Sequence, residues 1–195
     1  TPGVSFSSAT AMGLMMGALM SYLGSSQAIF ETDVYALGTY FPMAFGLIAA
    51  VMGFASFLNS RLVRRLGMRR LSHTGILGFV AVGALQVVFA FAFGGKPPLF
   101  LFGAVLAANM FLFSLTVTNF NAMAMEPLGD VAGTASSVFG SYTTIVSAIL
   151  GAVVGQAFDG TVVPLAFGYF GLGLLALLIV LWTERGRLFV PHHPD

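Results

Sequence analysis

Six long segments of the chain contain no charged residue. They cover residues 1–30, 34–60, 71–95, 97–125, 131–158 and 160–183, so each has 24 to 30 residues. About 20 apolar residues cross the hydrocarbon core of a bilayer as a helix, so each segment has room for one crossing and not for two. Strands of a membrane β-barrel alternate over about 10 residues and do not fit segments of this length. The pattern predicts an all-α integral membrane protein with six transmembrane helices, near 5–30, 36–60, 71–93, 99–125, 132–157 and 163–182.

The composition of the 195-residue chain supports this prediction. Hydrophobic residues make up 57% of it and charged residues only 8%, whereas about 25% of a soluble domain is charged. An ordinary water-soluble globule and intrinsic disorder are therefore excluded. The net charge of +1 implies no nucleic-acid surface, and the absence of cysteine rules out disulfides and thiolate metal sites.

The basic residues are distributed unevenly between the connecting segments. Five arginines lie within 61–70 and two more in the C-terminal tail, whereas the opposite side of the predicted bundle has Lys96 alone. Cytoplasmic segments of membrane proteins carry an excess of Lys and Arg. We therefore expect residues 61–70, residues 126–131 and both ends of this chain to lie in the cytoplasm.

The ends and loops of the chain predict how it is organised. The sequence begins with Thr1 and has no basic stretch ahead of its first apolar segment, so it lacks the form of a signal peptide. We expect it to begin inside a longer protein. The loops near 94–98, 126–130 and 159–160 are short and rich in turn residues, which favours one compact bundle of antiparallel neighbours.

Two predicted helices carry a stripe of small residues at helical spacing. The fifth has Ser137, Ser141, Thr144, Ala148, Gly151 and Gly155, and the first has Gly13, Gly17, Ser21, Gly24 and Ala28. Small residues allow helix backbones to approach closely in lipid. We expect these stripes to serve helix packing.

The predicted spans lack the residues that most catalytic chemistry requires. No Asp, Glu, Lys or Arg lies in the middle of a span, so this chain has no obvious intramembrane proton carrier. Its three histidines have no metal-ligand spacing. Ser136, Ser137 and Ser141 have no basic partner to activate them. We therefore predict no metal, no cofactor and no enzymatic activity.

An uncharged polar, aromatic and thioether set at membrane depth is the candidate substrate cavity. Its members are Met16, Met20, Tyr22, Ser26, Gln27, Asn109, Phe113, Thr116 and Asn119. Amides, hydroxyls, aromatic rings and flexible thioethers suit a cavity for varied, mostly apolar compounds. The alternative is that the polar groups pair between helices while Met and Phe face lipid.

Three stretches carry a resemblance to a known family. They are residues 21–27 (SYLGSSQ) with 37–42 (LGTYFP), residues 59–70 (NSRLVRRLGMRR), and residues 126–137 (EPLGDVAGTASS). The chain resembles the C-terminal six-helix half of a major facilitator superfamily transporter, in particular the Bcr/CflA-type multidrug efflux branch. The likeness covers nearly all of 5–185.

The resemblance implies a twelve-helix bundle of two halves, each a three-plus-three inverted repeat. Residues 1–185 would form the C-terminal half and 186–195 a cytoplasmic tail. The first, second, fourth and fifth spans would line a central cavity, and the third and sixth would face lipid. Members of the family export drugs or small metabolites against inward proton flow across the bacterial inner membrane. The coupling carboxylate would lie in the N-terminal half. The partners of this chain would be that N-terminal half, the substrate, protons and membrane lipid.

A cytoplasmic latch and two alternative functions complete the predictions. Arg61, Arg64, Arg65 and Arg69 would pair with Glu126 or Asp130 in one transport state. Alternatively, these arginines only set the topology and contact anionic lipid. The chain could also be a non-transporting or split membrane half that assembles with a partner, and an intramembrane enzyme is a third alternative.

Overall fold

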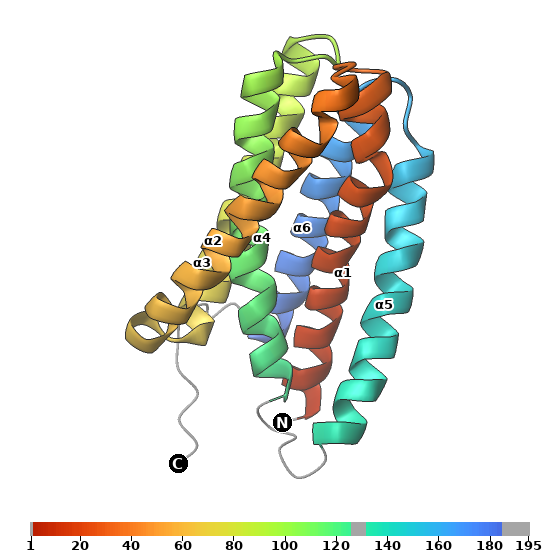
Figure 1. Cartoon of the computed structure of the whole chain (residues 1–195). Helices are drawn as coiled ribbons and strands as arrows, with labels where there is room; N and C mark the ends of the chain where they lie inside the picture. The colour runs from red at the N-terminus through yellow and green to blue at the C-terminus, as the bar shows by residue number, and fades with distance from the viewer. Residues whose placement is uncertain (1, 126–131, 185–195) are drawn as a thin grey trace.

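The computed structural model describes residues 2–125 and 132–184, and these fold into one bundle of six long helices (Figure 1). The helices are α1 (Pro2–Ser26), α2 (Phe41–Leu66), α3 (Met68–Ala92), α4 (Leu99–Met125), α5 (Ala132–Gln156) and α6 (Val163–Thr183). All six are long and apolar enough to cross a membrane, and the described residues contain no strand. The predicted all-α membrane bundle is confirmed.

The second helix is longer than the charge pattern predicts. It continues to Leu66 and carries Arg64 and Arg65 in its last turn, because arginine is a good helix former and a cation is favourable at a helix C-terminus. Gly67 alone separates α2 from α3, with a φ of +80° that glycine adopts without strain. Most of the basic segment 61–70 is therefore helical.

The first helix is extended at its C-terminal end by a wider helical turn. Residues Gln27–Thr32 form a π-helix that continues α1, and a short 3₁₀-helix at Gly38–Tyr40 leads into α2. The π-turn buries Ile29 and Phe30. The helical rod that begins with α1 therefore continues past the predicted end of the first span.

The helix contacts repeat after three helices. The first helix packs against α5 and α6, and α4 packs correspondingly against α2 and α3, while α1 contacts α4 and α3 contacts α6. Exchanging α1–α3 for α4–α6 leaves this pattern unchanged. Because each set has an odd number of helices, α4 begins at the opposite end of the bundle from α1 (Figure 1). The packing thus supports the three-plus-three inverted arrangement.

Burial differs strongly between the helices. The first helix is the most enclosed, whereas α2 and α5 are the least buried and lie on opposite flanks of the bundle (Figure 1). The sixth helix is half enclosed by α1 and α3. The largest exposed helical faces in the described chain therefore belong to α2 and α5.

The loops at the end opposite the arginines are tied together. The backbone N–H of Val162 donates to the carbonyl of Gly95 over 3.0 Å, and the Tyr35 hydroxyl donates to the carbonyl of Pro97 over 2.8 Å. Burial raises the pKa of the Tyr35 phenol well above its usual range. Three separate loops thus meet around the turn between α3 and α4.

Candidate functional site

Three glycines of the small stripes each lie against a larger residue of the other helix and bring α1 and α5 into close contact. A Cβ added to Gly13 would lie 3.4 Å from Val146, and one added to Gly17 would lie 3.0 Å from Leu150. A Cβ on Gly151 would overlap the Met20 side chain and lie 3.0 Å from the Met20 carbonyl carbon. The expected packing role of these stripes is met at these three glycines.

Next to this contact, α1 and α5 leave an open groove of about 610 Å³. Its lining includes Met20, Leu23, Gly24, Ala148, Ala152 and Gln156. Gly24 has no neighbour within 4 Å of the position a Cβ would take, so this part of the stripe faces open space. A mostly apolar wall with a flexible thioether and one amide suits an apolar compound that carries a hydrogen-bonding group.

The other predicted cavity residues of the first span lie mostly inside the bundle. Tyr22 is buried and its ring stacks on Phe45 at 5.7 Å between centroids. Ser26 is buried and donates to the carbonyl of Leu23 over 3.1 Å. Met16 packs against the hydrophobic core, whereas Gln27 is exposed at the start of the π-turn. Of this set, the structure places Met20 in the groove.

The predicted cavity residues of the fourth span pair with other helices. The Asn109 amide donates to the Gln86 amide oxygen of α3 over 2.6 Å. The Asn119 amide donates to Asn59 of α2 over 2.8 Å and to the carbonyl of Leu115 over 2.7 Å. These contacts match the alternative that the sequence left open, in which polar groups join helices.

Phe113 and Thr116, the other two predicted cavity residues of the fourth span, also lie in the interior of the bundle. Both are buried, and the Thr116 hydroxyl donates to the Leu112 carbonyl of its own helix over 2.7 Å. Thr116 also lies against Gly75 of α3, where a Cβ would meet the threonine hydroxyl. Neither side chain reaches the groove between α1 and α5.

Sequence reasoning missed the partners of these amides. Asn59, Gln86 and the Ser56–Ser114 pair, joined over 2.8 Å, all serve contacts between helices. Gln86 and Ser56 are isolated polar residues inside apolar runs, whereas Asn59 lies directly before Ser60 and Arg61. An isolated polar residue in an apolar run is a signal that could have marked Gln86 and Ser56 as candidates for interhelical contacts, because polar side chains hydrogen-bond across helices in membranes.

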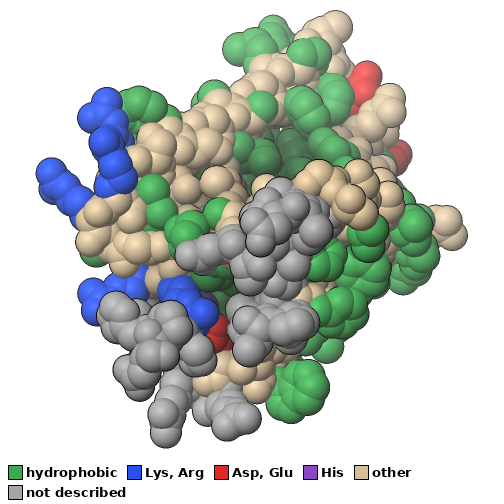
Figure 2. Space-filling view, turned by 90° about the horizontal axis from the view of Figure 1, so that it is seen from below, with side chains coloured by type: hydrophobic (Ala, Val, Ile, Leu, Met, Phe, Trp, Pro, Cys, Tyr) green, Lys and Arg blue, Asp and Glu red, His purple; other side chains and the backbone are tan. Residues whose placement is uncertain are grey.

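The basic end of α2 forms a second candidate site. Arg61, Arg64, Arg65 and Leu62 line a hollow of about 510 Å³, and the Arg61 guanidinium lies 5.2 Å from the centroid of the Phe57 ring. Figure 2 shows the basic side chains gathered at one side of this end of the bundle. Three exposed cations thus surround one concavity.

Arg69 has a different environment from these three arginines. Its guanidinium bonds both carboxylate oxygens of Glu184 over 2.8 Å, which joins the start of α3 to the end of α6. Both side chains are largely shielded from solvent. The proposed latch partners Glu126 and Asp130 lie outside the described residues, so the latch stays a prediction.

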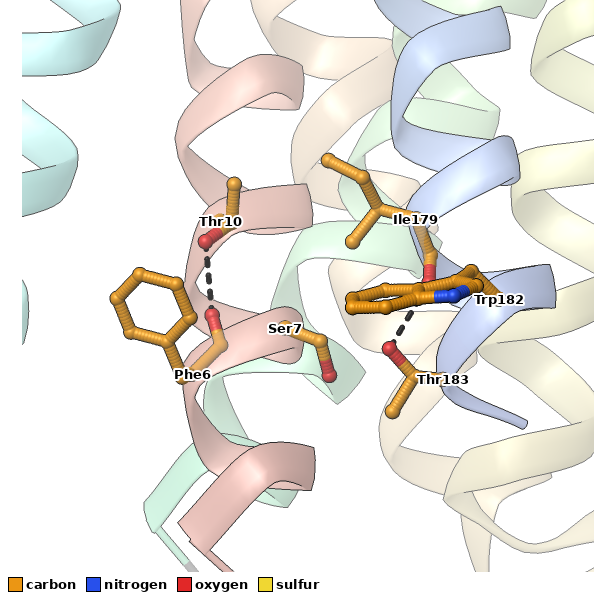
Figure 3. A pocket seen from close by; sticks show the side chains of 6 residues that line it. All are labelled: Phe6, Ser7, Thr10, Ile179, Trp182 and Thr183. Atoms are coloured by element: carbon orange, nitrogen blue, oxygen red, sulfur yellow. Dashed lines mark hydrogen bonds between the residues drawn. The ribbon is translucent and has the colours of Figure 1, made fainter. Parts of the chain in front are cut away.

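A third concavity lies between α1 and α6 (Figure 3). It has a volume of about 570 Å³, and Phe6, Ile179 and Trp182 are among its lining residues. Its hydroxyls at Thr10 and Thr183 donate to carbonyls of their own helices over 2.8 and 2.9 Å. This concavity between α1 and α6 therefore offers an apolar surface with few polar groups to bind a ligand.

The described residues provide little for catalysis or metal binding. They contain no group of three His, Asp or Glu side chains able to hold a metal ion. The hydroxyls of Ser136 and Ser137 donate to the carbonyl of Gly133, over 3.0 and 3.1 Å. These serines are bound to their own helix rather than to a general base.

The fold and its grooves define an all-α membrane bundle with six spans. A comparison with curated proteins finds similarity to the "Bicyclomycin resistance protein homolog" of Haemophilus influenzae, with 28% identity over 164 residues. The match covers 80% of this chain and 40% of that protein, so the chain spans about two fifths of the length of the relative it matches. No family model and no solved structure matches the chain.

Proposed function

We propose that this chain is one six-helix half of a secondary transporter that exports drugs or small metabolites by alternating access. The observation that carries the proposal is the similarity to a protein named for bicyclomycin resistance, which covers 80% of this chain but 40% of that protein. A six-span bundle that corresponds to part of a longer membrane protein suits one half of a two-half carrier.

The exposed faces of α2 and α5 support a second bundle packed against this one. Small residues are exposed or half-buried along one side of each helix: Gly46, Ala49 and Gly53 on α2, and Ser141, Thr144 and Ala148 on α5. Neither Gly46 nor Gly53 has a neighbour within 4 Å of a Cβ position. Small residues allow close helix approach in lipid, so these faces suit contact with the N-terminal half.

The groove between α1 and α5 is the wall that this chain would contribute to the substrate cavity. It opens beside the small face of α5, where Ala148 and Gly155 line it. Met20 supplies an adaptable apolar surface and Gln156 an amide. Substrate would bind here by burying apolar area, which explains tolerance of varied compounds better than selectivity for one.

Proton coupling and the latch are parts of the same proposal. The middle of each span lacks a carboxylate, so the coupling acid would lie in the N-terminal half. Arg61, Arg64 and Arg65 would pair with Glu126 or Asp130 in the inward-closed state, with both ends of this chain in the cytoplasm of a bacterial cell. Neutralising either acid should shift cysteine crosslinking between the inward-open and outward-open forms, and unchanged crosslinking in both variants would contradict the latch.

Blocking the groove in the full-length protein tests the proposed function. Ala148→Trp should fill the groove and lower drug resistance and efflux at least tenfold in a sensitive host. Leu178→Trp, on the exposed face of α6, is the matched control and should leave both unchanged. Efflux by the parent should stop when a protonophore is added. Full efflux by Ala148→Trp at equal protein levels would contradict the groove, and absence of efflux by the parent would contradict transport.

A further inference from the structure

The second helix presents three different faces around its axis. Ile48, Ala55 and Asn59 form its buried face. The exposed small residues Gly46, Ala49 and Gly53 form the neighbouring face. A third face, which we call the apolar stripe, is also exposed. It consists of Met43, Leu47, Ala50, Phe54 and Phe57. These positions recur every three or four residues, so they lie on one side of the helix.

Large apolar side chains are strongly exposed along this stripe. Met43 is 71% exposed, Leu47 66%, Phe54 59% and Phe57 57%. Helix interfaces in membranes favour small residues, which the adjacent face of α2 supplies. The bulky stripe therefore suits fluid hydrocarbon chains rather than another helix.

The arginines continue the same stripe at its basic end. Arg61 follows Phe57 by four residues and Arg65 follows Arg61 by four, so all three project from one side of the helix. Residues 41–60 rise about 30 Å, about the thickness of the hydrocarbon core. Arg61, Arg64 and Arg65 thus begin where the phospholipid headgroups lie.

The charge of the hollow at this end is not neutralised by the described protein. The described residues form one ion pair, between Arg69 and Glu184, and none with Arg61, Arg64 or Arg65. The latter three surround the 510 Å³ hollow. The negative C-terminal end of the helix dipole offsets only about half a charge of the three guanidinium groups, so an anion is the complementary ligand.

We propose that the basic end of α2 binds an anionic phospholipid from the adjoining leaflet. Its phosphate occupies the hollow among Arg61, Arg64 and Arg65. Its acyl chains cross one leaflet, about half of the core, and so lie along the part of the apolar stripe nearest the arginines, at Phe57 and Phe54. A phospholipid has its anionic and hydrocarbon parts in this order. The inference needs a membrane-spanning α2 but does not depend on the proposed transport activity. The lipid would occupy these arginines when they are not paired with Glu126 or Asp130.

Quenching of a tryptophan placed in the stripe tests the proposal. Phe54→Trp would be introduced in a Trp182→Phe background, since Trp182 is the only native tryptophan. The full chain would be reconstituted with dibrominated phosphatidylglycerol or dibrominated phosphatidylcholine. We expect quenching to report a preference for phosphatidylglycerol of at least about fivefold, the factor expected from one arginine near an anionic surface.

Matched variants separate a specific site from general surface charge. The triple variant Arg61→Gln, Arg64→Gln, Arg65→Gln should lose the preference, whereas Arg70→Gln, an exposed arginine outside the hollow, should keep it. Ile149→Trp in the exposed face of α5 should report no preference. Equal quenching by both lipids, a preference that survives the triple variant, or equal loss with Arg70→Gln would overturn the proposal. Absence of quenching by either lipid would overturn it in favour of a protein that covers the stripe.

Discussion

The two flanking contacts of the bundle occupy equivalent places but are built differently. The contact between α1 and α5 relies on glycines: Gly13 and Gly17 lie against side chains of α5, and Gly151 lies against the backbone of α1. Its counterpart between α4 and α2 relies on hydrogen bonds, from Asn119 to Asn59 and between Ser114 and Ser56. Repeated topology therefore does not require repeated chemistry.

The difference predicts how each contact responds to mutation. A close backbone approach has no space for an added side chain, so enlargement is strongly unfavourable. A hydrogen bond between membrane helices contributes on average about 0.6 kcal/mol, because the separated helices find other partners. A single substitution at the glycine contact should therefore lower the free energy of unfolding strongly, whereas a single substitution at the polar contact should lower it only slightly.

The largest effect is expected from enlarging Gly151. Gly151→Leu would force α5 away from Met20 and should lower the free energy of unfolding by about 3 kcal/mol or more. Thermal unfolding in detergent measures the change. Gly155→Leu is the control, since Gly155 has no neighbour within 4 Å of a Cβ position. Equal stability of the two variants would refute close packing at Gly151.

An intermediate effect is expected from removing the amide between α4 and α2. Asn119→Leu leaves the buried Asn59 oxygen without its donor, and should cost about 1 to 2 kcal/mol. The double variant Asn59→Leu, Asn119→Leu should recover part of this loss. Asn121→Leu, at an exposed position of the same helix, should change little. A double variant less stable than the sum of its parts would contradict the pairing.

The smallest effect is expected at the serine pair. Ser56→Ala should cost about 0.5 kcal/mol or less, because Ser114 keeps a hydrogen bond to the Met52 carbonyl over 3.1 Å. Ser114→Ala removes both bonds and should cost more. The same unfolding measurement in detergent compares them, and a larger loss from Ser56→Ala would reverse our interpretation of the pair.

The regular parts of this fold could be predicted from the sequence. The six helices follow from six uncharged segments, and the packing at Gly13, Gly17 and Gly151 follows from small residues at helical spacing. Both signals are periodic along one helix, so they need no knowledge of its neighbours. The same spacing also included Gly24, which instead faces the open groove.

The partners of polar residues could not be predicted in the same way. Asn109 and Asn119 suit either a cavity or another helix, and the choice depends on whether Gln86 and Asn59 lie opposite them. That information is set by the angle and depth at which two helices meet. The helical course of Arg61 and Arg64 was missed for a related reason, since charge indicates the membrane boundary but does not end a helix.

Only Gly67 lies between α2 and α3, so the basic end of α2 and the start of α3 are neighbours in the chain. Gly67 is followed at once by α3, whose Arg69 is anchored to Glu184 at the end of α6. A displacement of the arginines of α2, by lipid or by protein, would therefore act next to the Arg69–Glu184 ion pair that joins α3 to α6. The basic end of α2 would in this way be linked to the end of α6 through one glycine and one ion pair.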